Sequence, residues 1–132
     1  MDKLRVLIAD DHDLVRSTLA VFLRSLGGID VVAEAINGSA AVDSALATHP
    51  DLVVMDGSMP VMSGYEAARS IKAAMPETQV AIVSVSHGAM YEQHAANCHA
   101  DAFIPKGSLK RTLRMIVEQL RARKKSVLGA AA

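Results

Sequence analysis

Cysteine, tryptophan and long apolar runs are scarce or absent in this sequence, and each absence excludes a class of protein. The single cysteine, Cys98, excludes an internal disulfide framework and a thiolate metal cluster, and it favours a reducing compartment. No stretch reaches the roughly 20 apolar residues of a membrane span, and the apolar run near the N-terminus is too short for a signal peptide. We therefore expect a cytoplasmic protein that does not enter a membrane.

The composition is that of one globular domain. Of 132 residues, 51% are hydrophobic and 21% are charged, so the chain can bury a sizeable core. Aromatic residues make up only 3%, so the core must consist of Ala, Val, Leu, Ile and Met. We assign residues 1–125 to this domain and residues 126–132 to a disordered tail or the start of a linker.

Charge is balanced overall but unevenly distributed along the chain. Thirteen of the 14 acidic residues precede residue 106, whereas eight of the 14 Lys and Arg residues lie within residues 106–125. Such asymmetry can mark a nucleic-acid or partner surface. Because no aromatic residues are interleaved for base stacking, we favour a solvated helix face and expect no nucleic acid to bind this domain.

Short apolar runs alternate with longer amphipathic segments. The apolar runs predict strands at residues 4–9, 31–35, 52–55, 80–85 and 102–105. The other segments predict helices at residues 13–26, 39–48, 65–75, 89–98 and 109–124. Apolar strands joined by helices form a parallel sheet that is covered on both faces. With right-handed crossovers, we expect an α/β fold with an open, doubly wound five-stranded sheet.

Residues that start and stop helices occur near these boundaries. Gly27 and Gly28 follow the first predicted helix, and Pro76 ends the third. Ser39 and Ser108 belong to a residue type that caps helix N-termini, and we expect them to begin the second and the last helix.

Polar side chains occur at the carboxyl ends of four of the five predicted strands. These are Asp10 and Asp11 at the first strand, Asp56 at the third, Ser84 at the fourth and Lys106 at the fifth. In an open α/β sheet, ligands bind beyond the carboxyl ends of the strands. The second strand ends in Glu34, Ala35 and Ile36 and adds nothing to this set. We therefore expect one polar site built from four strands.

Three carboxylates in one place favour a divalent metal ion. Like charges held together raise one another's pKa values unless a cation compensates. Mg²⁺ prefers oxygen ligands and commonly uses one or two carboxylates together with phosphate oxygens. Lys106 adds a charge that suits a phosphoryl oxygen, and Ser84 adds a hydroxyl. Because a carboxylate such as Asp56 can itself attack phosphorus, these groups indicate phosphoryl transfer.

Each of these residues also has an ordinary structural explanation. Asp10 and Asp11 could cap a helix N-terminus. Asp56 could belong to a turn, and Lys106 could be a solvated lysine. Their conjunction at the strand ends of one βα fold favours the functional explanation.

The sequence resembles the receiver domain of two-component response regulators in the order of its motifs. These are "VLIADDH", an Asp followed by "MP" and Gly, "SVS" and "FIPK". The resemblance covers roughly residues 3–123. The stretches "RVLIADDHDLVRSTLAVFL" and "VVAEAINGSAAVDSA" are most similar to the NarL/FixJ subfamily. The resemblance implies a flavodoxin-like (βα)5 fold with strand order 2-1-3-4-5.

The resemblance also implies the metal ligands and the phosphoacceptor. Asp56 would accept the phosphoryl group. Asp11 and Asp56 would bind Mg²⁺, or Mn²⁺ in its place, directly. The backbone carbonyl of Ser58 would be a third ligand, and Asp10 would act partly through water.

Three residues would carry the response to phosphorylation. Ser84 and Lys106 would contact the phosphoryl group. Movement of Ser84 would let the switch aromatic, Phe103, turn inward. This change would remodel the face formed by the fourth helix, the fifth strand and the fifth helix.

The sequence departs from the family pattern before the fifth strand. Receiver domains often have a glycine where "CHADA" places His99, so His99 must adopt a positive φ or the turn must differ. The five histidines show no metal-ligand spacing, and we assign no histidine to a metal. They are His12, His49, His87, His94 and His99.

The resemblance implies a switch rather than an enzyme. A sensor histidine kinase or phosphotransfer protein would supply the phosphoryl group, and the basic last helix would contribute to a homodimer or partner surface once the domain is phosphorylated. The output would be transcription, through a C-terminal DNA-binding domain outside this chain, unless the chain is a stand-alone receiver. An alternative is a haloacid-dehalogenase-like phosphohydrolase with an aspartyl nucleophile. Such an enzyme needs a second acid two residues after the nucleophile, and Ser58 at this position argues against it. A scaffold that never takes phosphate would have lost part of the acid cluster or Lys106.

Overall fold

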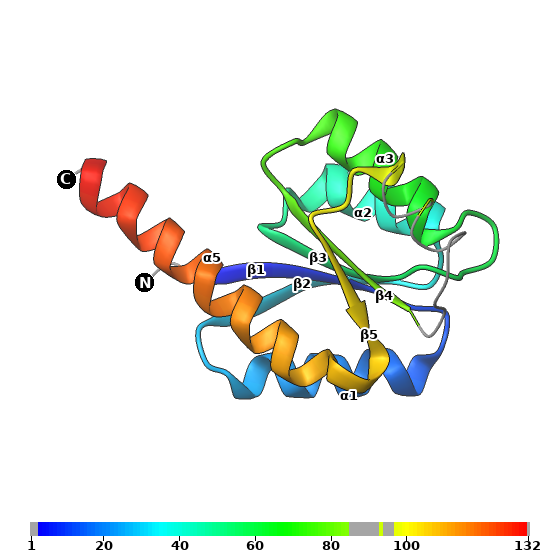
Figure 1. The fold of residues 1–132 in the computed structure, drawn as a ribbon, viewed down its shortest axis with the longest axis horizontal. Helices are drawn as coiled ribbons and strands as arrows, with labels where there is room; N and C mark the ends of the chain where they lie inside the picture. The colour runs from blue at the N-terminus through cyan, green and yellow to red at the C-terminus, as the bar shows by residue number, and fades with distance from the viewer. Residues whose placement is uncertain (1–2, 85–92, 94–96, 132) are drawn as a thin grey trace.

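The fold is a five-stranded parallel sheet with helices on both faces (Figure 1). The computed structural model describes residues 3–84, 93 and 97–131, and only the backbone of residues 126–131. The strands are β1 (Leu4–Ala9), β2 (Ile29–Ala35), β3 (Leu52–Asp56), β4 (Gln79–Ser84) and β5 (Ala102–Pro105). The helices are α1 (Asp13–Ser25), α2 (Gly38–Thr48), α3 (Gly64–Ala74), the 3-10 helix η1 (Lys106–Ser108) and α5 (Leu109–Ala131). The order β2-β1-β3-β4-β5, with every pair parallel, confirms the predicted fold class.

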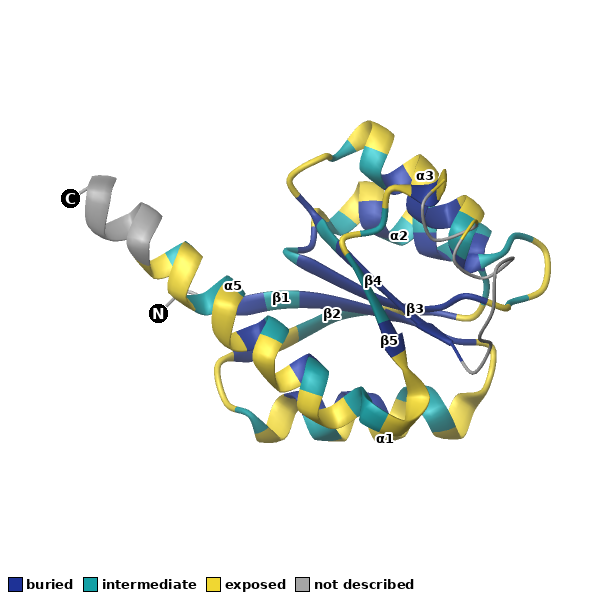
Figure 2. Ribbon diagram, in the orientation of Figure 1, coloured by how far each residue is buried: buried dark blue, intermediate teal, exposed yellow. Residues whose placement is uncertain are grey.

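Two hydrophobic clusters hold the layers together. On one face of the sheet, α1 and α5 pack over a cluster that includes Leu23, Val54 and Leu113. On the other face, α2 and α3 pack over a cluster that includes Ala45 and Ile71. The central strands are buried and the outer helix faces are exposed (Figure 2). This double coverage explains why the strands are apolar throughout rather than alternating.

The register of the central strands determines what meets at the carboxyl edge. Ala9 of β1 pairs with Met55 of β3, so Asp10 and Asp56, which follow them, are neighbours across the sheet. Asp56 itself pairs with Val83 of β4, one residue before Ser84. The topology therefore brings three of the predicted polar strand ends to one place.

Most element boundaries agree with the predictions to within two residues, but one predicted N-cap is wrong. Asn37, not Ser39, caps α2, because its side chain accepts a hydrogen bond from the Ala40 amide at 2.8 Å. Ser108 lies in η1, and its hydroxyl donates to the Pro105 carbonyl at 3.3 Å. The chain tightens into this 3-10 turn directly before α5, and Ser108 as the cap of α5 remains a prediction.

The last helix is longer than predicted, since α5 continues past residue 124 to Ala131 and takes in most of the segment expected to be a tail. Good helix formers dominate its second half, and a single late glycine does not stop it. Lys124 ties the helix to the sheet by donating to the Lys3 carbonyl at 3.1 Å and to Asp51 at 2.9 Å. Beyond this point α5 extends past the sheet (Figure 1). The domain boundary at residue 125 remains a prediction.

The helix predicted at residues 89–98 lies mostly outside the described residues. Gln93, Asn97 and Cys98 are described, and all are helical. After them, His99 has a φ of 60°, so the non-glycine residue adopts the left-handed conformation, one of the two outcomes expected. No helix in the described part of the chain is long and apolar enough to cross a membrane.

Candidate functional site

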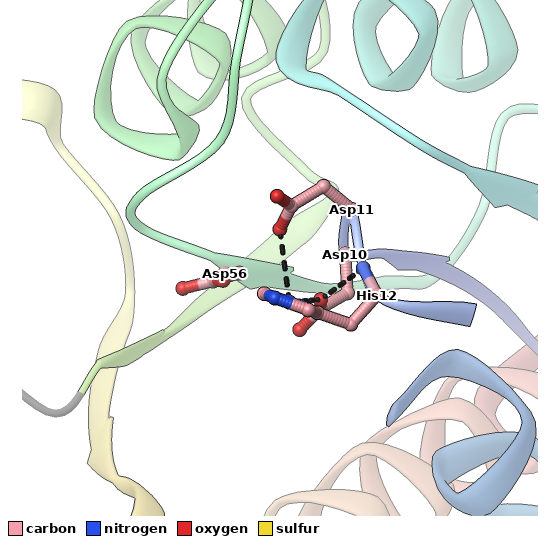
Figure 3. A group of neighbouring side chains, drawn as sticks. All are labelled: Asp10, Asp11, His12 and Asp56. Atoms are coloured by element: carbon pink, nitrogen blue, oxygen red, sulfur yellow. Dashed lines mark hydrogen bonds and ion pairs between the residues drawn. The ribbon is translucent and has the colours of Figure 1, made fainter. Parts of the chain in front are cut away.

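An acidic group occupies the carboxyl edge of the sheet (Figure 3). Asp10, Asp11 and Asp56 each offer a carboxylate oxygen, His12 offers a ring nitrogen, and these atoms all lie within 4.8 Å of one another. Asp10 and Asp56 are buried, with exposed fractions of 3% and 7%, whereas Asp11 and His12 are exposed. The three predicted acids thus converge, with two of them at the bottom of the group and one at its rim.

Backbone and side-chain hydrogen bonds fix the turn that carries Asp10 and Asp11. The Asp10 amide donates to the Ala35 carbonyl of β2 at 3.0 Å, which extends the sheet pairing by one residue. The Asp10 carboxylate then accepts from the His12 amide at 2.8 Å, forming an Asx turn into α1. The acid pair is therefore held at a defined strand-to-helix turn.

Close backbone packing shapes the loop that follows Asp56. The Gly57 amide donates to the Val83 carbonyl and the Gly64 amide donates to the Gly57 carbonyl, both at 3.0 Å. A Cβ atom on Gly64 would overlap the Asp56 carbonyl, so only glycine allows the loop to close here. The Ser58 amide donates to the Asp56 carboxylate at 3.2 Å. That the Ser58 carbonyl is a metal ligand remains a prediction.

The surroundings of Asp56 are unfavourable to its charge. Burial raises the pKa of Asp56 above its usual 3.8, and the neighbouring Asp10 and Asp11 raise it further. The Ser58 amide and Lys106 lower this pKa, but they do not outweigh burial and like charge. A divalent cation would offset both causes, and the oxygen donors are those that Mg²⁺ and Mn²⁺ accept. The residues present therefore fit such an ion.

His12 is the member of the group that sequence reasoning missed. Its Nδ1 atom lies 3.2 Å from one oxygen of Asp10 and 3.2 Å from one of Asp11, and its side chain is 66% exposed. The histidines were dismissed because they lack mutual metal-ligand spacing. The relevant signal was instead that His12 directly follows the acid pair at a strand end.

The remaining predicted residues lie on β4, β5 and η1. Asp56 and Lys106 line one cavity of about 170 Å³, together with apolar side chains of α1, β4 and α5. Ser84 is the last residue of β4 and is buried, with 7% exposed. Phe103 of β5 is partly buried and packs against the cluster under α2 and α3, which includes Cys98. Their roles in binding and switching remain predictions.

Comparison with known proteins agrees with this geometry. The family model of the response regulator receiver domain matches residues 6–118. A protein-glutamate methylesterase/protein-glutamine glutaminase from Nocardioides sp. is 34% identical over 97% of this chain and 37% of that protein. The response regulator GacA from Pseudomonas viridiflava is 33% identical over 80% of this chain and 49% of that protein. The chain thus spans less than half the length of these curated relatives.

Solved structures give the same result. The signal receiver domain of a NarL from Mycobacterium tuberculosis superposes with a TM-score of 0.83 at 28% identity, covering 92% of this chain and 98% of that one. The response regulator domain of Thermotoga maritima CheB gives 0.77 at 30% identity, covering 91% and 95%. Since both kinds of regulator are similar, membership in the NarL/FixJ subfamily remains a prediction. The chain belongs to the family of response regulator receiver domains.

Proposed function

We propose that this domain accepts a phosphoryl group on Asp56 from a sensor histidine kinase or a phosphotransfer protein, in a reaction that needs Mg²⁺ or Mn²⁺. The observation that carries the proposal is the convergence of Asp10, Asp11 and Asp56 at one sheet edge, where burial and like charge raise the pKa of Asp56. Asp10, Asp11, Asp56 and the Ser58 carbonyl would hold the ion. When bound, the ion would neutralise charge on the phosphoryl oxygens.

In the transfer, Asp56 is the only protein residue that forms a covalent bond. A carboxylate oxygen of Asp56 forms a bond to phosphorus while the bond between phosphorus and the donor's imidazole nitrogen breaks, and that nitrogen keeps the electron pair. Lys106 and Ser84 would bind the oxygens of the transferred group through an ammonium and a hydroxyl. Positioning and charge neutralisation therefore supply the catalysis, as in other phosphoryl transfers.

The same residues would produce the response. Engagement of Ser84 by the phosphoryl group would draw Phe103 inward. This movement would remodel the face formed by the helix expected at residues 89–98, β5 and α5. This surface would control a homodimer or a partner. The domain itself would be a switch and not an enzyme, and it would act in the cytoplasm.

Two outputs fit the relatives. Control of transcription through a DNA-binding domain outside this chain is the output that the resemblance to the NarL/FixJ subfamily implies, and a NarL receiver is among the similar structures. Control of an attached effector enzyme fits the methylesterase relatives, of which the chain covers about a third. The receiver chemistry is the same in both cases.

The test is the intact mass of the protein after incubation with acetyl phosphate and Mg²⁺. We expect an adduct of one phosphoryl group on the wild type and on Asp51→Asn, and none on Asp56→Asn or after removal of Mg²⁺. Asp51 is the matched control because it is an aspartate at the other end of the same strand. An adduct that persists in Asp56→Asn, or its absence from the wild type, would overturn the proposal.

A further inference from the structure

We infer that Arg16 is a positioning residue for the acid pair, acting through the backbone of Asp10 and anchored by Glu34 of β2. The inference rests on the proposed function and concerns how the metal-binding carboxylates are aimed. It gives β2 a part in the site, although the ends of the other four strands supply the polar residues themselves.

Arg16 lies one turn into α1 and points back toward the site. Its Nη1 atom donates to the Asp10 carbonyl at 2.8 Å. Its Nη2 atom forms an ion pair with Asp13, and its Nε atom lies 3.6 Å from a carboxylate oxygen of Glu34. The side chain is only 13% exposed. The guanidinium thus bridges the end of β1, the first turn of α1 and the end of β2.

The carbonyl that Arg16 holds belongs to the peptide group between Asp10 and Asp11. Because a peptide group is planar, fixing its oxygen also fixes the direction in which the Asp11 backbone begins. The Asp10 amide on the other side is already bonded to the Ala35 carbonyl at 3.0 Å. Arg16 therefore completes the fixation of the backbone from which both carboxylates project.

A role limited to helix stability does not explain this arrangement. The contact between Asp13 and Arg16 alone could form at the surface, as such pairs commonly do. Instead the guanidinium is largely buried, and its Nε atom has no hydrogen-bond partner among the described residues. Leaving a buried donor unpaired costs free energy. Arg16 therefore keeps its contact with the Asp10 carbonyl even though its Nε–H group goes without a hydrogen bond.

Positioning and simple electrostatics predict opposite outcomes when Arg16 is changed. If Arg16 acted only as a positive charge near the acids, removing it would strengthen the binding of a divalent cation. If Arg16 positions the acids, losing its planar, forked guanidinium must weaken cation binding even when the positive charge is kept. Lysine keeps the charge but offers a single nitrogen in place of a planar fork. Arg16→Lys therefore separates the two explanations.

The experiment measures Mn²⁺ affinity by electron paramagnetic resonance, and Mg²⁺ affinity by competition, on the full chain. We expect about 10-fold weaker binding in Arg16→Lys and in Arg16→Met, as is typical for residues that orient metal ligands. Glu34→Gln, which removes the anchor charge, should weaken binding less than the Arg16 variants do, because Glu34 is 40% exposed and lies 3.6 Å from Arg16. Arg24→Met is the matched control, because Arg24 is exposed on the same helix, and its affinity should equal that of the wild type.

The outcomes separate this inference from the proposed function. Wild-type affinity, or tighter binding, in both Arg16→Lys and Glu34→Gln overturns the positioning role while the proposed function stands. A wild type that binds neither ion and takes no phosphoryl group overturns the proposed function, and this inference with it. If Arg16→Met fails to fold, as urea unfolding would show, Arg16→Lys and Glu34→Gln still decide the question.

Discussion

The two ends of β3 each carry an aspartate, and the two residues have opposite surroundings. Asp51, just before the strand, accepts hydrogen bonds from the Arg5 amide at 2.8 Å and from the Lys124 ammonium at 2.9 Å. Asp56, the last residue of the strand, is more buried and has the carboxylates of Asp10 and Asp11 beside it. One aspartate faces a cation at contact distance, and the other faces like charge.

The difference distinguishes the surroundings of a structural carboxylate from those of the proposed phosphoacceptor. At Asp51, charge and hydrogen bonds are matched, so the residue joins β1, β3 and α5 at the amino edge of the sheet. At Asp56, the Ser58 amide and Lys106 compensate burial and like charge only in part, so the charged carboxylate is disfavoured and a bound cation would stabilise it. Residue type alone does not distinguish these roles, but the partners do.

The largest expected difference between the two aspartates is in metal binding. Asp11→Asn removes one of the proposed direct ligands, so Mg²⁺ affinity should fall about 30-fold, or ~2 kcal/mol. Asp51→Asn makes the same chemical change at the other edge of the sheet and should leave affinity within 2-fold, about 0.4 kcal/mol. Titration calorimetry measures both. Equal affinities for the two variants would show that the acid group is not the metal site.

The next effect is on stability, where the two ends of β3 should respond with opposite sign. Asp51→Asn weakens the contact with Lys124 and should lower the free energy of unfolding by about 1 kcal/mol. Asp56→Asn removes a buried charge among like charges and should raise it by about 1 kcal/mol, or roughly 4 °C in Tm. Urea unfolding in the presence of EDTA measures both. Loss of stability in Asp56→Asn would mean that its charge is compensated in the free protein.

The stabilisation from Asp56→Asn should also depend on pH. Because the folded protein raises the pKa of Asp56, the fold binds this proton more tightly than the unfolded chain does. As pH rises from the usual pKa of 3.8 through the raised folded value, the wild type loses stability that the asparagine variant keeps. The gain should therefore be largest at neutral pH and vanish below the usual pKa. A gain that is the same at every pH would contradict this origin.

The sequence was sufficient for the fold and for the acids because both follow from pattern and topology. Apolar strands between amphipathic helices specify a doubly covered sheet, and any polar residue at a strand's carboxyl end must then reach the same edge. Asp10, Asp11 and Asp56 could be assigned together without knowing a single side-chain contact. The family motifs supported the same residues independently.

What the sequence could not provide depends on side-chain reach and on local competition. Asn37 and Ser39 are both capping residues two positions apart, and the contacts that distinguish them, the Asn37 cap bond and the close approach of Gly38 to the Met62 carbonyl, appear only in the folded chain. The contact from Arg16 to Glu34 joins residues on different elements, so no local pattern marks it. His12 escaped notice because its partners are acids rather than other histidines.

The smallest effects concern the lysine that lies near each aspartate, Lys106 of η1 near Asp56 and Lys124 of α5 beside Asp51. Lys124 is partly exposed, so Lys124→Met should cost only about 0.5 kcal/mol of stability and leave the reactivity of Asp56 unchanged. Lys106 is exposed and lowers the pKa of Asp56, so Lys106→Met should let that pKa rise further. Because the proposed nucleophile is the ionised carboxylate of Asp56, the half-maximal rate of labelling by acetyl phosphate should move to higher pH in Lys106→Met and stay in place in Lys124→Met. Rates measured across pH by intact mass test this, and identical midpoints would show that Lys106 does not act on the charge of Asp56.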